Sequence, residues 1–103
     1  MDYANKTILL TGASSGIGLE FAQELAKKGG NLILVARSKE KLEELATKLK
    51  NLYHVNVKVL SIDLAKSGAA EVIYNELEDN NKEVDILINN AGVGTLDYLD
   101  RLC

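Results

Sequence analysis

The sequence predicts an α/β fold, in which helices cover both faces of a parallel sheet. Four short apolar runs alternate along the chain with three longer segments whose apolar residues recur at helical spacing. The resulting order is βαβαβαβ, and strands separated by helices in this way usually lie parallel, joined by right-handed crossovers. A glycine-rich stretch, residues 11–18, stands between the first apolar run and the first helical segment. Its glycines allow the sharp turn from a strand into a helix.

The first two predicted strands are Thr7–Thr11 and Asn31–Ala36. The second contains the run Leu32-Ile33-Leu34-Val35, which is apolar without alternation, as in a strand buried on both faces. Between the two strands a helix is predicted over residues 16–28, and Gly29 stands where it ends. The apolar residues that share one face of this helix are Ile17, Phe21, Ala22 and Leu25.

The second helix is predicted to start after Ser38 and to end near Asn51. Ser38 can cap it, because a serine side chain at that position can accept a hydrogen bond from a backbone N–H of the first turn. A third helix is predicted over residues 66–80. The residues expected on the inner faces are Leu42, Leu45, Leu49 and Leu52 in the second helix, and Ala69, Val72, Ile73 and Leu77 in the third.

The two remaining strands differ in a way that indicates their places in the sheet. Residues 55–62 partly alternate between apolar and polar and include Lys58, a pattern typical of an edge strand. Residues 84–89 are nearly all apolar, with no protecting charge at their centre. Because a bare apolar edge promotes aggregation, we expect the fourth strand to have a further neighbour.

Composition limits the classes of function. The chain has 103 residues, enough for one small domain, of which 47% are apolar and 26% charged, as in soluble globular proteins. The net charge is −3 without a basic tract, so we expect no nucleic-acid partner, and no apolar run approaches the roughly 20 residues of a membrane span. Cys103 is the only cysteine, no signal-peptide pattern is visible, and no metal-ligand cluster occurs. We therefore expect a cytoplasmic protein without a metal site.

The glycine-rich stretch predicts a phosphate-binding loop. Glycines at positions 12, 16 and 18 let the backbone approach a ligand, and the helix that follows points its unpaired N–H groups at an anion. Three glycines could also form only a tight turn, but the strand before them and the helix after them fit a dinucleotide site. In that arrangement the strand order is 3-2-1-4, which makes the third strand an edge.

The end of the second strand indicates which dinucleotide binds. NAD sites commonly have an acidic residue about 20 positions after the glycine loop, which hydrogen-bonds the ribose 2′-hydroxyl. Here the chain reads Ala36-Arg37-Ser38-Lys39, without a carboxylate. A guanidinium can hold a 2′-phosphate through two hydrogen bonds, so we expect NADP(H), with Arg37 as the main ligand and Ser38 assisting. The alternative is a solvated arginine at the start of a helix.

Two motifs together resemble those of the short-chain dehydrogenase/reductase family. The loop has the spacing G-x-x-x-G-x-G, and the fourth strand is followed by the tetrapeptide at positions 89–92, Asn-Asn-Ala-Gly. The resemblance covers essentially the whole chain, but only the N-terminal, cofactor-binding half of the family. It implies a Rossmann-type three-layer fold over residues 1–103, an incomplete domain truncated after the fourth strand.

The resemblance also implies roles for individual positions. Asp63 and Leu64 would lie against the adenine, although Asp63 could instead be an ordinary N-cap of the third helix. The residues that would surround the adenosine ribose and the pyrophosphate are Gly12, Ser14, Ser15, Gly16, Ile17 and Gly18. The residues that would stabilise the central sheet and support the adenine ribose are Asn89, Asn90, Ala91 and Gly92.

The groups that carry the family's chemistry are not found in the sequence. The resemblance implies a catalytic tyrosine followed four residues later by a lysine, and no tyrosine here has that partner; the tyrosines are Tyr3, Tyr53, Tyr74 and Tyr98. His54, the only histidine, belongs to no evident catalytic constellation, and we expect it at the surface. No catalytic residue is therefore assigned.

Two functional hypotheses follow. The first is the NADP(H)-binding portion of an oxidoreductase that transfers hydride between the cofactor and an alcohol or carbonyl substrate, inactive as this piece alone. The alternative is a stand-alone nucleotide-binding or self-associating module without catalysis. Because the fourth strand has a bare edge and the third helix would lie alone on its sheet face, we expect a homo-oligomer, formed through that edge or through the missing C-terminal half.

Overall fold

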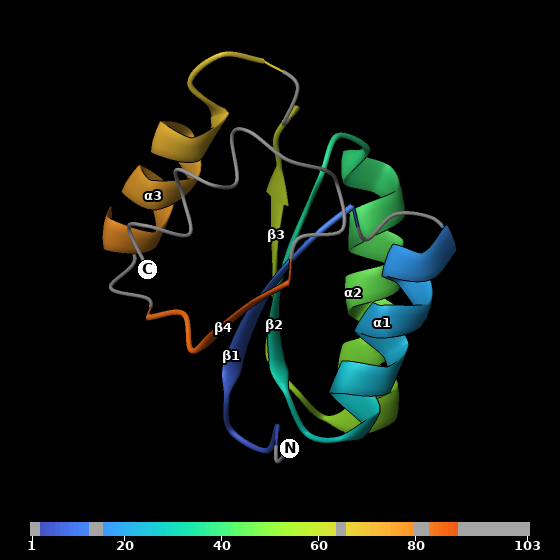
Figure 1. Ribbon diagram of the computed structural model, residues 1–103. Helices are drawn as coiled ribbons and strands as arrows, with labels where there is room; N and C mark the ends of the chain where they lie inside the picture. Colours follow the sequence, from blue (N-terminus) through green and yellow to red (C-terminus); the bar gives the residue numbers. More distant parts are fainter. Residues whose placement is uncertain (1–2, 13–15, 64–65, 80–82, 89–103) are drawn as a thin grey trace.

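The computed structural model describes residues 3–12, 16–63, 66–79 and 83–88, and not the side chain of residue 17. Its elements alternate between strands and helices as the sequence predicts (Figure 1). In chain order they are β1 (Thr7–Thr11), α1 (Gly16–Lys27), β2 (Asn31–Ala36), α2 (Lys39–Tyr53), β3 (Val57–Ser61), α3 (Ala69–Asp79) and β4 (Ile86–Ile88).

The four strands form one parallel sheet in the order β3-β2-β1-β4, which confirms the predicted topology. Helices α1 and α2 cover one face of this sheet, and α3 covers the other (Figure 1). The described residues thus form three layers, with β3 at one edge, as predicted from Lys58 and the alternation around it.

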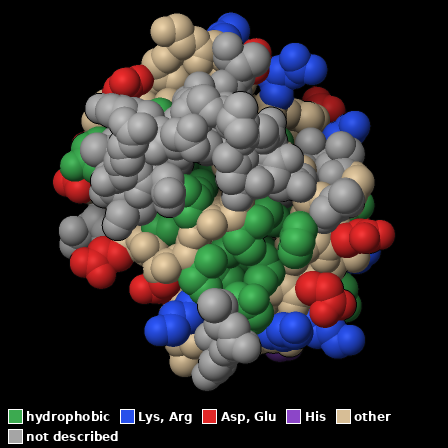
Figure 2. Space-filling model, viewed as in Figure 1, with side chains coloured by type: hydrophobic (Ala, Val, Ile, Leu, Met, Phe, Trp, Pro, Cys, Tyr) green, Lys and Arg blue, Asp and Glu red, His purple; other side chains and the backbone are tan. Residues whose placement is uncertain are grey.

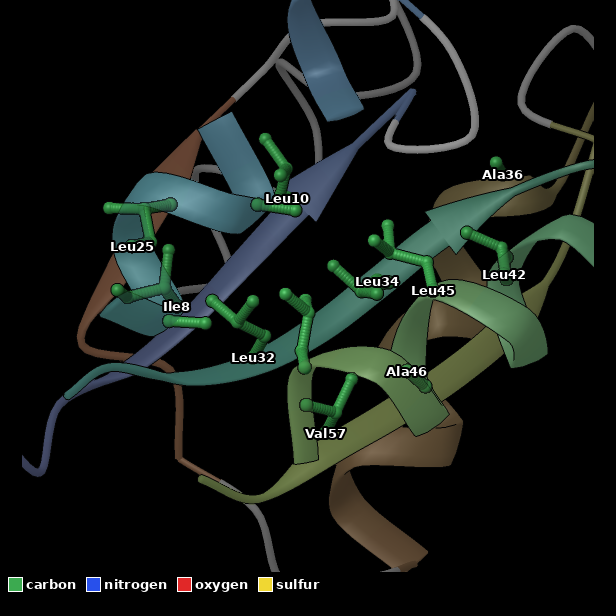
Figure 3. Close-up of a cluster of buried hydrophobic side chains, with 13 residues drawn as sticks. Ile8, Leu10, Leu25, Leu32, Leu34, Ala36, Leu42, Leu45, Ala46 and Val57 are labelled. Carbon is green, nitrogen blue, oxygen red and sulfur yellow. The ribbon is translucent and has the colours of Figure 1, made fainter. Parts of the chain in front are cut away.

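Strands β1 and β2 have the predicted bounds because both of their faces are buried. Along β1, Ile8 and Leu10 face the cluster beneath α1 and α2, whereas Leu9 faces the cluster beneath α3, and β2 alternates in the same way. The larger of these two clusters lies between the sheet and the two helices (Figure 3). Burial on both sides explains why these strands are apolar runs without alternation.

Three residues expected on inner helix faces are exposed, so those expectations were wrong. The exposed fractions of Phe21, Leu52 and Val72 are 43%, 56% and 50%. In each case the inward position belongs to a residue one place away: Ala22 and Ile73 are buried, and Tyr53 packs against the larger cluster. Successive residues of a helix point about 100° apart, so of two neighbouring apolar residues at the border of the stripe only one faces the sheet.

The starts of two helices differ in detail from the sequence analysis. Ser38 is the N-cap residue of α2, as predicted, but its side chain makes no capping hydrogen bond; its carbonyl accepts from the N–H of Leu42 at 3.1 Å. Helix α3 begins at Ala69, later than predicted, because the chain turns at Gly68, whose φ is +84°. Strand β3 is also shorter than predicted, over Val57–Ser61.

Polar side chains form hydrogen bonds with backbone groups at the amino ends of the paired strands. The Thr7 N–H donates to Asp85 Oδ2 at 2.8 Å, and the Asp85 N–H donates to the Thr7 carbonyl at 2.9 Å. The Asn56 N–H likewise donates to Asn31 Oδ1 at 3.0 Å. Both side chains satisfy backbone donors beside the first residues of the strands, so they help to fix the register of β1 with β4 and of β2 with β3.

Strand β4 pairs with β1 through Ile86, Leu87 and Ile88, all half-buried. Hydrophobic side chains gather over β4 and between β4 and α1 on the face seen in Figure 2, with charged side chains around them. Self-association through this edge is not tested by a single chain and stays a prediction. No helix in the described ranges is long and apolar enough to cross a membrane.

Helix α2 offers a matched test of the packing. Leu49 is fully buried and Leu52, three residues later, is more than half exposed. We expect Leu49→Ala to lower the free energy of unfolding by about 2–5 kcal/mol, because it leaves a cavity in the larger cluster. Leu52→Ala should change it by less than about 0.5 kcal/mol, as surface substitutions do. Urea denaturation of both variants measures these changes. An equal decrease in the free energy of unfolding in the two variants would contradict the packing described for α2.

Candidate functional site

The carboxyl ends of the strands carry the predicted site residues. Because the strands are parallel, the segments that follow β1, β2 and β3 leave the sheet at the same end (Figure 1). Gly12 directly follows β1, Arg37 directly follows β2, and Asp63 lies two residues beyond β3. In open parallel sheets ligands bind at this end, where the order of the strands reverses. Here that reversal is at β1, which lies between β2 and β4.

Two glycines of the loop that the structure describes have the positive φ expected of a tight turn. Gly12 and Gly16 have φ angles of +68° and +58°, in the left-handed region that other residues adopt only with strain. The Gly12 N–H donates to the Val35 carbonyl at 2.8 Å, so the chain stays attached to β2 as it leaves β1. Among the described residues, no atom lies within 4 Å of a Cβ built on Gly16. The positive φ, rather than crowding, therefore favours glycine at this position. The space that the described residues leave beside it suits a ligand that approaches the backbone.

The first turn of α1 begins directly at this loop. Gly16 is the first residue of α1, and Gly18, in its first turn, is buried. The N–H groups at the start of a helix have no partner within the helix, and the helix dipole places partial positive charge there. Those groups can hold the phosphates of a nucleotide. Ser14, Ser15 and the side chain of Ile17 lie outside the described part of the chain.

The segment after β2 carries positive charge at the same end of the sheet as the loop. Arg37 is exposed, Ser38 is half-buried and Lys39 is exposed at the start of α2. The four residues from Ala36 to Lys39 include no carboxylate, so nothing in this segment would repel a phosphate. Arg37 is held from the neighbouring strand, because the Ser61 Oγ–H donates to the Arg37 carbonyl at 3.0 Å.

The third segment, after β3, contains Asp63. This residue is half-buried, and its carbonyl accepts a hydrogen bond from the Lys66 N–H at 3.1 Å. Helix α3 begins at Ala69, six residues later, so Asp63 is not its N-cap and that alternative was wrong. Four further predicted residues, Asn89, Asn90, Ala91 and Gly92, lie outside the described residues, as does Leu64.

Other features lie away from this end of the sheet. A hollow of about 450 Å³ opens at the amino ends of the strands, beside Thr7, Asn31 and Val57, the opposite end from the glycine loop. His54 ends α2 there with a φ of +56° and is exposed, as expected. Within the ranges described, no group of three or more metal-ligating side chains comes together.

The structure therefore brings Gly12, Gly16, Arg37, Ser38 and Asp63 to one end of the sheet. It adds Ser61, which the sequence analysis did not single out. The only signal in the sequence is weak: Val57, Val59 and Ser61 occupy one row of an alternating strand, and the row ends on a hydroxyl. Only the pairing of β2 with β3 shows that this hydroxyl meets the backbone of Arg37.

Comparison with known proteins agrees with this architecture. The family model described as short chain dehydrogenase matches residues 6–102. The 11-beta-hydroxysteroid dehydrogenase A of Sesamum indicum is 35% identical over 101 residues, which cover 98% of this chain and 29% of that protein. The chain thus spans less than a third of the length of this relative.

Solved structures of similar sequence have the same fold. L-sorbose reductase from Gluconobacter frateurii, complexed with NADPH and L-sorbose, superposes with a TM-score of 0.80 at 38% identity, over 91% of this chain and 36% of that one. A short-chain dehydrogenase from Sphingobium yanoikuyae in complex with NADPH gives 0.76 at 40% identity, over 86% and 34%. The family model, the relative and both structures agree: the chain belongs to the short-chain dehydrogenase family and corresponds to its N-terminal, cofactor-binding region.

Proposed function

We propose that this chain binds NADP(H), with Arg37 as the ligand of the 2′-phosphate. The observation that carries the proposal is the juxtaposition of a positive-φ glycine loop after β1 with an exposed arginine, and no carboxylate, after β2. A carboxylate in that place would favour NAD by accepting from the ribose 2′-hydroxyl, and it would repel a phosphate. The two solved structures named above, both with NADPH, support the proposal by similarity.

The remaining predicted residues complete the proposed site. Gly12, Ser14, Ser15, Gly16, Ile17 and Gly18 bind the pyrophosphate and the adenosine ribose, mainly through backbone N–H groups at the start of α1. Ser38 assists at the 2′-phosphate. Asp63 accepts from the exocyclic amine of the adenine, with Leu64 against the ring, and residues 89–92 support the adenine ribose. When bound, the nicotinamide would donate or accept the hydride in the reaction of the family.

For a protein that includes this chain, we propose hydride transfer between NADP(H) and an alcohol or carbonyl substrate. The relatives named above are reductases and dehydrogenases, which supports that reaction class. Proton transfer to or from the substrate oxygen needs a positioned acid or base, and no tyrosine of these residues is followed by a lysine four positions later. We therefore propose that the 103 residues alone bind the cofactor without using it. The cytoplasmic location stays a prediction.

The role of Arg37 is tested by comparing two cofactors that differ only in the 2′-phosphate. Arg37→Ala should weaken NADPH binding by about 1.5–3 kcal/mol, because a charge-assisted contact is lost. NADH binding should barely change. Calorimetry on the purified chain measures both affinities. Lys41→Ala, which removes an exposed positive charge from α2, is the matched control and should leave the preference intact. Equal losses for NADPH and NADH in Arg37→Ala would refute the 2′-phosphate assignment.

The absence of turnover is tested separately. We expect no sustained NADPH oxidation when the 103-residue chain is incubated with a range of aldehydes and ketones, because no general acid is assigned in these residues. The absorbance of NADPH reports the reaction, and a complete short-chain reductase serves as the positive control. Steady turnover that scales with the concentration of the chain would show that a catalytic group has been overlooked.

A further inference from the structure

The segment that carries Arg37 leaves the sheet where the backbone pairing of β2 with β3 ends. The last paired residues are Ala36 and Ser61, and beyond them the Ile62 N–H still donates to the Ala36 carbonyl at 3.0 Å. The next carbonyl along the chain is that of Arg37. It accepts from the Ser61 Oγ–H at 3.0 Å. A side-chain hydroxyl therefore continues the attachment of this segment one residue beyond the ladder.

Ser61 is the exception in its row of side chains. Side chains alternate between the faces of a strand, so Val57, Val59 and Ser61 share one face of β3. Val57 is buried in the cluster beneath α1 and α2, and Val59 packs against that cluster (Figure 3 labels Val57). Ser61 is exposed at the end of the row. Its replacement by alanine would remove the bond to Arg37 without opening a cavity in the core.

The other neighbours of Arg37 hold it less directly. Ser38, which follows Arg37, is the N-cap residue of α2, but the Ser38 side chain makes no capping hydrogen bond. Its carbonyl accepts the hydrogen bond from the Leu42 N–H that joins this residue to the helix. An arginine side chain has much rotamer freedom to lose when it binds a phosphate. Any additional freedom of the backbone beneath it would add to that entropic cost.

We propose that Ser61 is a positioning residue for cofactor specificity, which fixes the backbone of Arg37 so that the guanidinium is presented to the 2′-phosphate. This inference rests on the proposed NADP(H) function. Ser61 itself does not touch the cofactor in this proposal; it acts only through Arg37. Its effect is therefore confined to the ligand that carries a 2′-phosphate.

Calorimetry with NADPH and NADH on the 103-residue chain tests the effect on specificity. In Ser61→Ala we expect the affinity for NADPH to fall about two- to tenfold, the range that one hydrogen bond contributes net. The affinity for NADH should change less than about twofold, since NADH has no 2′-phosphate. Ser61→Thr keeps the hydroxyl, suits a strand and should restore the preference. Thr47→Ala, which removes an exposed hydroxyl from α2, should change neither affinity.

A measurement without ligand separates this inference from the proposed function. Amide-nitrogen relaxation should show greater picosecond-to-nanosecond mobility at Arg37 and Ser38 in Ser61→Ala, and not in Ser61→Thr. Unchanged mobility there would overturn the positioning role, as would equal losses of NADPH and NADH affinity. A wild-type chain that binds both cofactors equally would instead refute the NADP(H) proposal, and with it the specificity role of Ser61. The relaxation measurement would still decide whether Ser61 orders the backbone at Arg37 and Ser38.

Discussion

The pairing of β1 on both of its edges is the constraint on which the candidate site depends. β1 bonds to β2 on one side and to β4 on the other, and Ile8, Leu9, Leu10 and Thr11 are all fully buried. A shift of this strand by one residue would exchange the side chains that face the two hydrophobic clusters and would break two ladders. The point at which the chain leaves the sheet is therefore fixed, and the Gly12 N–H, bonded to Val35, fixes the first residue of the loop as well.

The two ends of the sheet are built for different tasks. At the amino ends, Asn31 and Asp85 use side-chain oxygens to satisfy neighbouring backbone donors, which stabilises the ladders. At the carboxyl ends, two glycines with positive φ, Arg37 and the half-buried Asp63 follow three neighbouring strands. The register is thus held at one end, while the residues of the proposed cofactor site lie in short segments at the other. Under the proposed function, such a division would let Arg37 determine the choice of cofactor with little effect on the sheet.

Much of this arrangement could be predicted from the sequence, and the exceptions have physical causes. β1 and β2 were predicted to the residue because burial on both faces makes them continuous apolar runs. The strand order was predicted from the dinucleotide-binding arrangement that the glycine loop indicates, and the positive φ at Gly12 and Gly16 follows from the conformational freedom of glycine. Phe21, Leu52 and Val72 were misplaced because helical spacing alone cannot tell which residue at the border of an apolar stripe meets the sheet. Ser61 was missed because its partner, a backbone carbonyl 24 residues away, leaves no trace in the sequence.

The pairing of β1 with β4 also has a consequence for how the chain is made. Thr7 and Asp85, which are bonded in the native sheet, are 78 residues apart. During synthesis at 5–20 residues per second, the second edge of β1 waits about 4–16 s for its partner. β1, α1 and β2 can associate earlier, because their contacts are closer in sequence. A nascent chain therefore exposes the unpaired edge of β1, with Ile8, Leu9 and Leu10 at its centre, for seconds. In that interval a chaperone or a neighbouring nascent chain competes with β4.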